Sequence, residues 1–365
     1  MSLTALQDCY CPPIPTAIAA SSGSGAIDAT GEKFMYNGHM KYAGSAASKN
    51  ITKVGFRFAS VTKAGGSALT VSLQNVSAAA GPPYQADGTP DQTVAIANAD
   101  AGFVSNVFYM TAALSAERTV TLGERLAIVV EFDGAGRLGA DTIGFSNCNI
   151  NEGRFTGIIG GCSAFVSGAL TLQTVIPNCI FEFSDGTFGT FANAYPFETL
   201  NTVTYNVDTV NQDEVALKIN LPFEAQVYGA WALIHAVAGA DFELVLYEGT
   251  TAVATTVIDS NSISVASQFR VAEWCFPPVT IKPNTDYYLS LKPTTTNNVQ
   301  FPYFELDNAA HMQAHAGGTN FLFSARVGAG SWAAATATRR PFAGLRFSAF
   351  PSVNQPLINS PVLIG

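Results

Sequence analysis

Charged side chains are scarce in this chain of 365 residues. Only 12% of the residues are Asp, Glu, Lys or Arg, and 18 basic residues accompany 27 acidic ones, which gives a formal net charge of −9. A surface that binds a phosphate backbone needs clustered Lys and Arg, whereas here the basic residues are scattered along the chain. The sequence therefore predicts no nucleic-acid partner.

Long hydrophobic runs are missing as well. No run approaches the roughly 18 consecutive apolar residues of a membrane-spanning helix, so we expect no membrane insertion. The first 32 residues contain no Lys or Arg, and their most apolar stretch, residues 14–20, is short and contains Pro15. This composition is unlike a secretory leader. We therefore expect a protein that is made and assembled in the cytoplasm.

Histidine and cysteine are few, and the common catalytic motifs are absent. The chain has four His and six Cys, and it contains no Gly-x-Ser-x-Gly elbow, no His-Glu-x-x-His motif and no P-loop. Cys9 and Cys11 lack the second nearby pair that a zinc site needs. The other cysteines are spaced like buried small apolar residues rather than like a disulfide framework: Cys148, Cys162, Cys179 and Cys275. The sequence therefore predicts a protein without enzymatic activity, cofactor or metal.

Two polar groups are the strongest candidates for metal binding. His311 and His315 would share one face of a helical turn, but no third ligand follows, and residues 317–318, both Gly, favour a loop. A polar stretch farther upstream carries oxygen ligands of the kind that calcium prefers, although its Asp-Gly and Thr-Pro pairs are also ordinary turn formers. Its residues are Asp87, Asp91, Asn98 and Asp100. We interpret both groups as structural.

Short apolar runs dominate what is present. The chain is 48% apolar and holds 32 Gly, and Val, Ile, Thr, Phe and Tyr recur in short alternating runs. Alternation with a period of two is typical of strands with one buried face. No stretch keeps the 3.6-residue period of an amphipathic helix over several turns. The sequence therefore predicts an all-β protein.

The order of these runs repeats within the chain. Residues 33–185 and 200–350 can be laid over one another, which indicates an internal duplication. The matching segments are 51–58 with 225–232, 69–73 with 242–246, 120–130 with 279–291, and 180–184 with 344–348. We therefore expect two consecutive antiparallel β-sandwich domains of jelly-roll type. Residues 186–199 would form a linker whose aromatic side chains pack between the domains.

The two ends lie outside this repeat and are expected to form extended arms. Residues 1–32 and 351–365 have little charge and several Pro residues, which favour an extended backbone. The C-terminal arm carries five aliphatic residues: Leu357, Ile358, Val362, Leu363 and Ile364. Because burial of such side chains is favourable, we expect the arms to contact other subunits. Wrapping around the chain's own domain is the alternative.

The three tryptophans, Trp231, Trp274 and Trp332, have two interpretations. Exposed aromatic rings can pack on the apolar faces of sugar rings, so an aligned row would bind a glycan. Large aromatic side chains are also the main content of a β-sandwich core. The sequence favours the core and leaves the glycan platform open.

The chain resembles virion proteins of tailed bacteriophages in its nearly uncharged arms and its duplicated β-modules. These modules, with strand segments such as 51–56 and 122–132, are similar to carbohydrate-binding modules. This resemblance implies a non-enzymatic virion component, such as a capsid decoration protein, a head fibre or a tail or neck accessory protein. It implies assembly in the host cytoplasm, and the partners would be other copies of the chain and other virion proteins.

Two other classes of protein remain open. One is a pair of glycan-binding or receptor-binding modules that act in host adhesion, for which an exposed aromatic row would be the evidence. The other is a glycoside hydrolase, which needs two carboxylates positioned across a cleft.

Overall fold

The computed structural model of the chain describes residues 15–17, 26–42, 46–76, 86–150, 162–166, 169–173, 175–191, 194, 196, 199–208, 212–234, 241–259, 270–315 and 318–349. It is 61% strand and 4% helix, and its strands form several antiparallel sheets. The prediction of an all-β protein is therefore confirmed.

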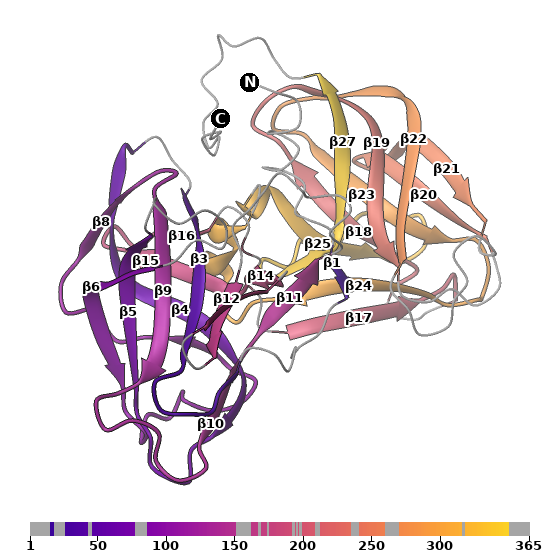
Figure 1. Cartoon of the computed structure of the whole chain (residues 1–365). Helices are drawn as coiled ribbons and strands as arrows, with labels where there is room; N and C mark the ends of the chain where they lie inside the picture. The colour runs from indigo at the N-terminus through magenta and orange to yellow at the C-terminus, as the bar shows by residue number, and fades with distance from the viewer. Residues whose placement is uncertain are drawn as a thin grey trace. The chain divides into compact units, whose positions relative to one another are not determined.

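The chain divides into two compact units, of which the first contains strands β2 to β16 and the second contains β17 to β27 (Figure 1). The first short strand is β1 (Pro15–Ala17), and the first unit consists of β2 (Ala26–Ile27), β3 (Lys33–Tyr42), β4 (Ser48–Thr62), β5 (Leu69–Val76), β6 (Ala86–Ile96), β7 (Phe108–Met110), β8 (Arg118–Thr121), β9 (Arg125–Phe132), β10 (Thr142–Phe145), β11 (Asn147–Ile150), β12 (Cys162–Val166), β13 (Ala169–Gln173), β14 (Val175–Pro177), β15 (Cys179–Phe183) and β16 (Phe188–Phe191).

The second unit has fewer strands, and two short 3-10 helices lie between β24 and β25 in the chain. Its strands are β17 (Thr199–Tyr205), β18 (Glu214–Asn220), β19 (Ala225–Ile234), β20 (Phe242–Glu248), β21 (Thr251–Ile258), β22 (Arg270–Ile281), β23 (Asp286–Pro293), β24 (Val299–Glu305), β25 (Phe321–Arg326), β26 (Arg339–Pro341) and β27 (Ala343–Ala349). The helices are η3 (Ala309–Ala314) and η4 (Gly318–Asn320).

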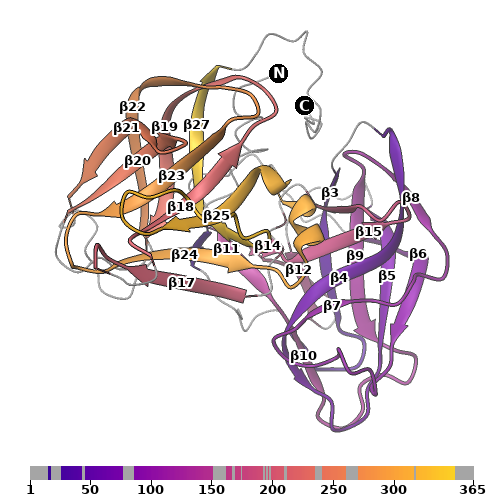
Figure 2. The same cartoon turned by 180° about the vertical axis from the view of Figure 1, so that it is seen from behind.

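One sheet has the same strand order in both units. In the first unit the order β6-β5-β9-β3 is part of a 13-stranded sheet, and the other side of β3 pairs with β12 at residues 33–36 and with β16 at residues 40–42. In the second unit the order is β21-β20-β23-β18-β25, as Figure 2 shows from behind. Each strand of the first sheet has a counterpart at the same place in the second, and the counterparts also follow one another in the same order along the chain. The pairs are β3 and β18, β5 and β20, β6 and β21, β9 and β23, and β12 and β25. The pairing around the central strand of a second layer also agrees, since β4 lies between β15 and β7 or β8, and β19 lies between β27 and β22.

The registers of the matched strands agree as well. Val130 on β9 pairs with Phe34 on β3 and with Val71 on β5. Leu291 on β23 pairs in the same way with Val215 on β18 and Leu244 on β20. Residues 69–73 of the first unit are therefore equivalent to residues 242–246 of the second. The strands that end segments 120–130 and 279–291 are equivalent as well, as the sequence comparison matched them. A one-residue slip would turn every side chain to the opposite face, so agreement of register is a stronger likeness than agreement of strand order.

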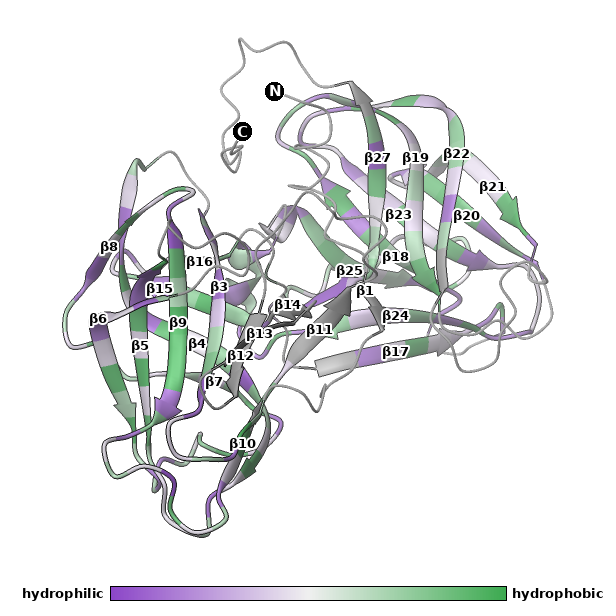
Figure 3. Cartoon of the chain, viewed as in Figure 1, coloured by the Kyte–Doolittle hydropathy of each residue, from purple (hydrophilic) through white to green (hydrophobic). Residues whose placement is uncertain are grey.

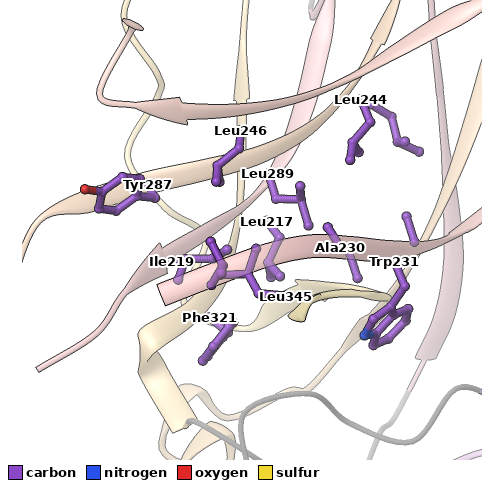
Figure 4. Packing of buried hydrophobic residues seen from close by; sticks show 14 of the residues in the cluster. Leu217, Ile219, Ala230, Trp231, Leu244, Leu246, Tyr287, Leu289, Phe321 and Leu345 are labelled. Atoms are coloured by element: carbon purple, nitrogen blue, oxygen red, sulfur yellow. The ribbon is translucent and has the colours of Figure 1, made fainter. Parts of the chain in front are cut away.

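Each unit has its own hydrophobic core, built from alternate residues of its strands. Figure 3 shows this alternation as changes of colour along the strands. In the second unit, Leu217, Leu244 and Leu289 from three neighbouring strands pack together with Leu345 from β27 (Figure 4). Full burial of one such side chain stabilises a fold by about 1.5–3 kcal/mol. The core positions therefore set the register of the sheets.

Two glycines occupy matched positions in the second layer. Gly55 on β4 pairs with Met110 on β7, and Gly229 on β19 pairs with Cys275 on β22. A methyl group added at Gly229 would lie 2.5 Å from the carbonyl oxygen of Trp274, and one at Gly55 would overlap the sulfur of Met110. A side chain is therefore sterically excluded at the same place in both units.

The linker expected at residues 186–199 requires a correction at its start. Residues 188–191 form β16, which pairs with β3 and β15. Phe191 is fully buried and its ring lies 5.0 Å from that of Phe181. A methyl group at Gly189 would lie 2.6 Å from the Lys41 carbonyl oxygen, so this glycine permits the close pairing. Phe188 and Phe191, two of the aromatic side chains that suggested a packed linker, are instead buried in the first unit.

Candidate functional site

The most developed polar site in the described residues lies on the outer face of the five-stranded sheet of the second unit. Val215, Leu246 and Leu289 point from this sheet into the core. Successive side chains in a strand point to opposite faces, so the residues next to them face away from the core. Those neighbours are Glu214, Tyr247 and Ser290.

The centre of this site is a buried ion pair between Glu214 and Arg326. Their side chains are only 4% and 5% exposed. Arg326 Nε donates to Glu214 Oε2 at 2.6 Å, and a second guanidinium nitrogen contacts the same oxygen. The other carboxylate oxygen, Oε1, accepts the hydroxyl groups of Tyr247 at 2.9 Å and Ser290 at 2.8 Å. Four donor contacts thus compensate the cost of burying the carboxylate.

Aromatic rings cover the guanidinium group of Arg326. Its central carbon lies 4.4 Å from the ring centres of both Tyr247 and Trp332. Trp332 stacks on Tyr288 with ring centres 4.6 Å apart and planes inclined by 7°, and its indole N–H donates to the Gly249 carbonyl at 3.0 Å. Cation–π contacts of this kind gain strength when water is excluded. Together they hold the segment after β25 against the sheet.

The arrangement is better suited to holding structure than to catalysis. Both Glu214 oxygens already accept hydrogen bonds from side chains of the same unit, so the carboxylate is engaged in internal contacts. Burial raises the pKa of Tyr247, and the nearby negative charge of Glu214 raises it further. The hydroxyl group is therefore a poor source of a nucleophilic oxygen. We interpret the cluster as a fixed support for the sheet and the chain segment above it.

The matched face of the first unit has different chemistry. Register places Lys33 at the position of Glu214, and Met35 at the position of Ala216. Met35 is fully buried in a small apolar cluster with Ala127 and Val129. Lys33 pairs with Glu131 at 2.9 Å near the surface. Among the described side chains, the first unit therefore has no buried ion pair at the position that matches Glu214.

Sequence reasoning missed the ion-pair cluster because its members are far apart in the chain. Glu214 and Arg326 are separated by 112 positions. The available signal was a charged residue at the end of each of two apolar strands. It indicates a special environment, but only the pairing of β18 with β25 shows that the two charges meet.

The three tryptophans do not form one row. Trp231 is 1% exposed and Trp274 is 7% exposed, and both belong to the hydrophobic core of the second unit. Burial leaves these two rings no free face for a sugar. Trp332 is partly exposed and lies on the outer side of the sheet with Tyr288. Of the three tryptophans, Trp332 alone is partly exposed, and its ring already contacts Tyr288 and Arg326.

His311 lies in η3, and His315 follows its last residue; both side chains are buried. A 3-10 helix has three residues per turn, so residues four apart are rotated by about 120° and do not share a face. Within the described residues, no three His, Cys, Asp or Glu side chains come close enough to hold a metal ion. His311 and His315 therefore do not share one face of an α-helical turn, which was the arrangement that suggested a metal pair.

The four oxygen-bearing residues of the predicted turn region have separate partners. Asp87 accepts the Thr89 backbone N–H at 2.9 Å, and Asp91 pairs with Arg118 at 2.9 Å. The Asn98 amide donates to two backbone carbonyls, and Asp100 accepts the Tyr109 hydroxyl at 2.7 Å. Each side chain thus fastens its own part of the backbone or a neighbouring strand.

Two cysteines with described side chains are free thiols, Cys179 and Cys275. Burial raises the pKa of the Cys179 thiol to about 12, so it behaves as a small apolar core residue. Cys275 is exposed. Cys9, Cys11, the side chains of Cys148 and Cys162, and the arm residues 357–364 lie outside the described residues.

Comparison with known proteins adds no family assignment. No protein-family model matches the chain, and no curated protein matches its sequence. Within the described residues, no helix is both long enough and apolar enough to cross a membrane.

Proposed function

We propose that the protein is a non-enzymatic structural component of a phage virion, such as a capsid decoration protein, a head fibre or a tail or neck accessory protein. In this proposal the two units are jelly-roll-like β-sandwich domains that arose by duplication, and the chain assembles through them and through its terminal arms. The observation that carries the proposal is the matched strand order and register of the two units. Repetition of one rigid module is an economical way to build an extended particle component.

The polar chemistry of the second unit supports the same proposal. The buried carboxylate of Glu214 is saturated by Arg326, Tyr247 and Ser290. An enzyme needs a reactive group held next to a space that a substrate can enter. In this cluster the polar atoms instead form hydrogen bonds with one another. We therefore favour a structural role over an enzymatic one for this protein.

The test of this role is the assembly state of the purified full-length chain. Mass photometry and negative-stain microscopy should show uniform multimers with cyclic symmetry, because virion accessory proteins act in several copies. A chain that remains a 38.3 kDa monomer at micromolar concentration would contradict the proposal. Screening the same sample against hydrolase substrates should give no turnover.

A second candidate function is glycan or receptor binding in host adhesion. Its support is Trp332, which is partly exposed on the outer face of a sheet and backed by Tyr288. Binding of the full chain to a glycan array, lost in Trp332→Ala and retained in a folded Trp332→Phe variant, would favour this function. An array without any signal would remove it.

A further inference from the structure

Strand β21 forms one edge of the five-stranded sheet in the second unit, where it pairs with β20 on one side. Within the described part of the chain, no strand pairs with its other side. Its eight residues, Thr-Ala-Val-Ala-Thr-Thr-Val-Ile, contain no charge, no Pro and no Gly. Val257 is 61% exposed, the highest value among the large exposed apolar side chains described. Such an edge is a template for pairing with another strand.

The matched edge of the first unit is protected. Its edge strand β6 carries Asp87, Pro90 and Asp91, and Gly88 has a φ of +82°. The register of β6 against β5 shifts at two places near these residues. Charge, proline and irregular pairing are the usual devices that prevent edge-to-edge association. The pairing of β21 with β20 also has one register shift, but β21 carries no charge and no proline. Since the two units share a strand order, the lack of charge and proline in β21 is a specific difference between them.

We propose that β21 is a self-association surface, on which β21 of a second copy of this chain pairs antiparallel across a two-fold axis. The strand is neutral along its whole length, so it offers nothing to a charged partner segment, whereas its Ala, Thr and Val residues complement one another. A two-fold axis uses the same patch on both copies. This inference does not depend on the proposed virion role.

The register of this pairing follows from the regular part of the strand. The pairing of β21 with β20 shifts between Leu246 and Tyr247, and it is regular from Ala254 to Ile258. The midpoint of that stretch is Thr256, so an axis there places Thr255 opposite Val257 of the second copy. Asp259 then lies opposite Val253, and no like charges face each other across the strands. At the other end, Glu248 is already paired with Lys282 at 2.6 Å.

The experiment compares the full-length chain with a double variant, Thr255→Lys and Val257→Lys. Both side chains are exposed, so the variant should fold and melt as the parent chain does. Four lysines would then meet in the paired strands, and we expect the association constant to fall about tenfold or more. The control is Val327→Lys, which adds a lysine at a valine that is 56% exposed outside β21. Sedimentation equilibrium at several micromolar concentrations measures all three proteins.

The register is tested separately by Thr256→Cys in a background in which Cys9, Cys11, Cys148, Cys162 and Cys275 are replaced by Ser and only the buried Cys179 is kept. Directly opposed residues of antiparallel strands are close enough for a disulfide, so mild oxidation should yield a covalent dimer, while the background protein alone should yield none. A parent chain that is monomeric, or an association unchanged by the two lysines in folded protein, would overturn the proposal. A lysine-sensitive association without the Thr256→Cys cross-link would overturn the register centred on Thr256.

Discussion

At the scale of single residues, the second unit depends on one buried charge pair. Glu214 and Arg326 are almost fully buried, and each described contact of the carboxylate is with an N–H or O–H donor. A buried pair of this kind adds little stability compared with apolar residues of the same size, but the loss of one partner leaves an uncompensated charge. The pair therefore matters most when it is broken.

Replacement of Glu214 by Gln should lower the free energy of unfolding by about 3–5 kcal/mol, because Arg326 would remain buried without its counter-charge. Urea denaturation followed by tryptophan fluorescence measures the effect. Glu243→Gln is the matched control, since its pair with Lys292 lies at the surface with side chains 25% and 43% exposed. We expect that control to cost less than about 1 kcal/mol. Equal losses in the two variants would contradict a special role for Glu214.

A second residue-scale prediction concerns acid stability. Hydrogen bonds from Thr187 and from Lys49 lower the pKa of Asp185 from 3.8 to about 2. Because the folded-state pKa is depressed, this group stabilises the fold above about pH 4, and the contribution is lost as the pH falls toward 2. The difference in Tm between the parent chain and Asp185→Asn should therefore be positive at pH 6 and vanish near pH 2. Thermal melts across this range measure it, and a difference independent of pH would refute the assignment.

At the scale of elements, the sequence predicted the strands of the shared sheet well. The matched segments 69–73 and 242–246 have equivalent partners in the two units, because strict alternation of apolar residues fixes both face and register. The second layer was matched less accurately. The sequence comparison matched Ile180 with Gly344. In the structure Gly55 pairs with Ile180, whereas the matching Gly229 pairs with Arg346, two residues beyond Gly344.

This offset in the second layer has a physical cause. A shift by two residues keeps every side chain on its face, so the hydrophobic pattern does not reveal it. The register of β27 against β19 shifts twice, at bulges that no sequence motif marks. The strand β16 was missed for a similar reason, since its Gly and Thr residues are also typical of a linker.

The matched glycines provide a test of the shared architecture. Gly229→Ala should destabilise the protein by about 1–3 kcal/mol, because the added methyl group meets the fixed Trp274 carbonyl. Gly55→Ala should cost less, since Met110 and Phe108 are side chains that can move. Gly134→Ala is the control, with no atom near the added group. Chemical denaturation of the three variants gives the ranking, and a loss for Gly134→Ala as large as that for Gly229→Ala would contradict the steric explanation.

At the scale of the whole molecule, the chain combines two units that share a strand order with ends that carry little charge. The resemblance to phage virion proteins came from the overall pattern of the sequence. The ion-pair cluster, and the edge of β21 that no described strand pairs with, needed the structure. The reason is physical: contacts between residues far apart in a chain depend on strand pairing, which composition and local period do not specify.

Removal of residues 351–365 tests the expected role of the C-terminal arm. Its five aliphatic side chains would each gain about 1.5–3 kcal/mol on full burial, while ordering the backbone costs about 1–2 kcal/mol per residue. A docked arm therefore needs a broad surface, which in the proposed assembly is a neighbouring subunit. We expect the shortened chain to melt at the same temperature but to form smaller multimers by mass photometry. Unchanged assembly would show that the arm is not part of an interface.

The most direct test of the virion role is immunogold electron microscopy of particles released from cells that produce this protein. Antibodies against the purified chain should label intact phage particles at a repeated position on the head, neck or tail, and the chain should sediment with the particles. Particles without label, together with chain found only in the unsedimented fraction, would contradict the proposed function.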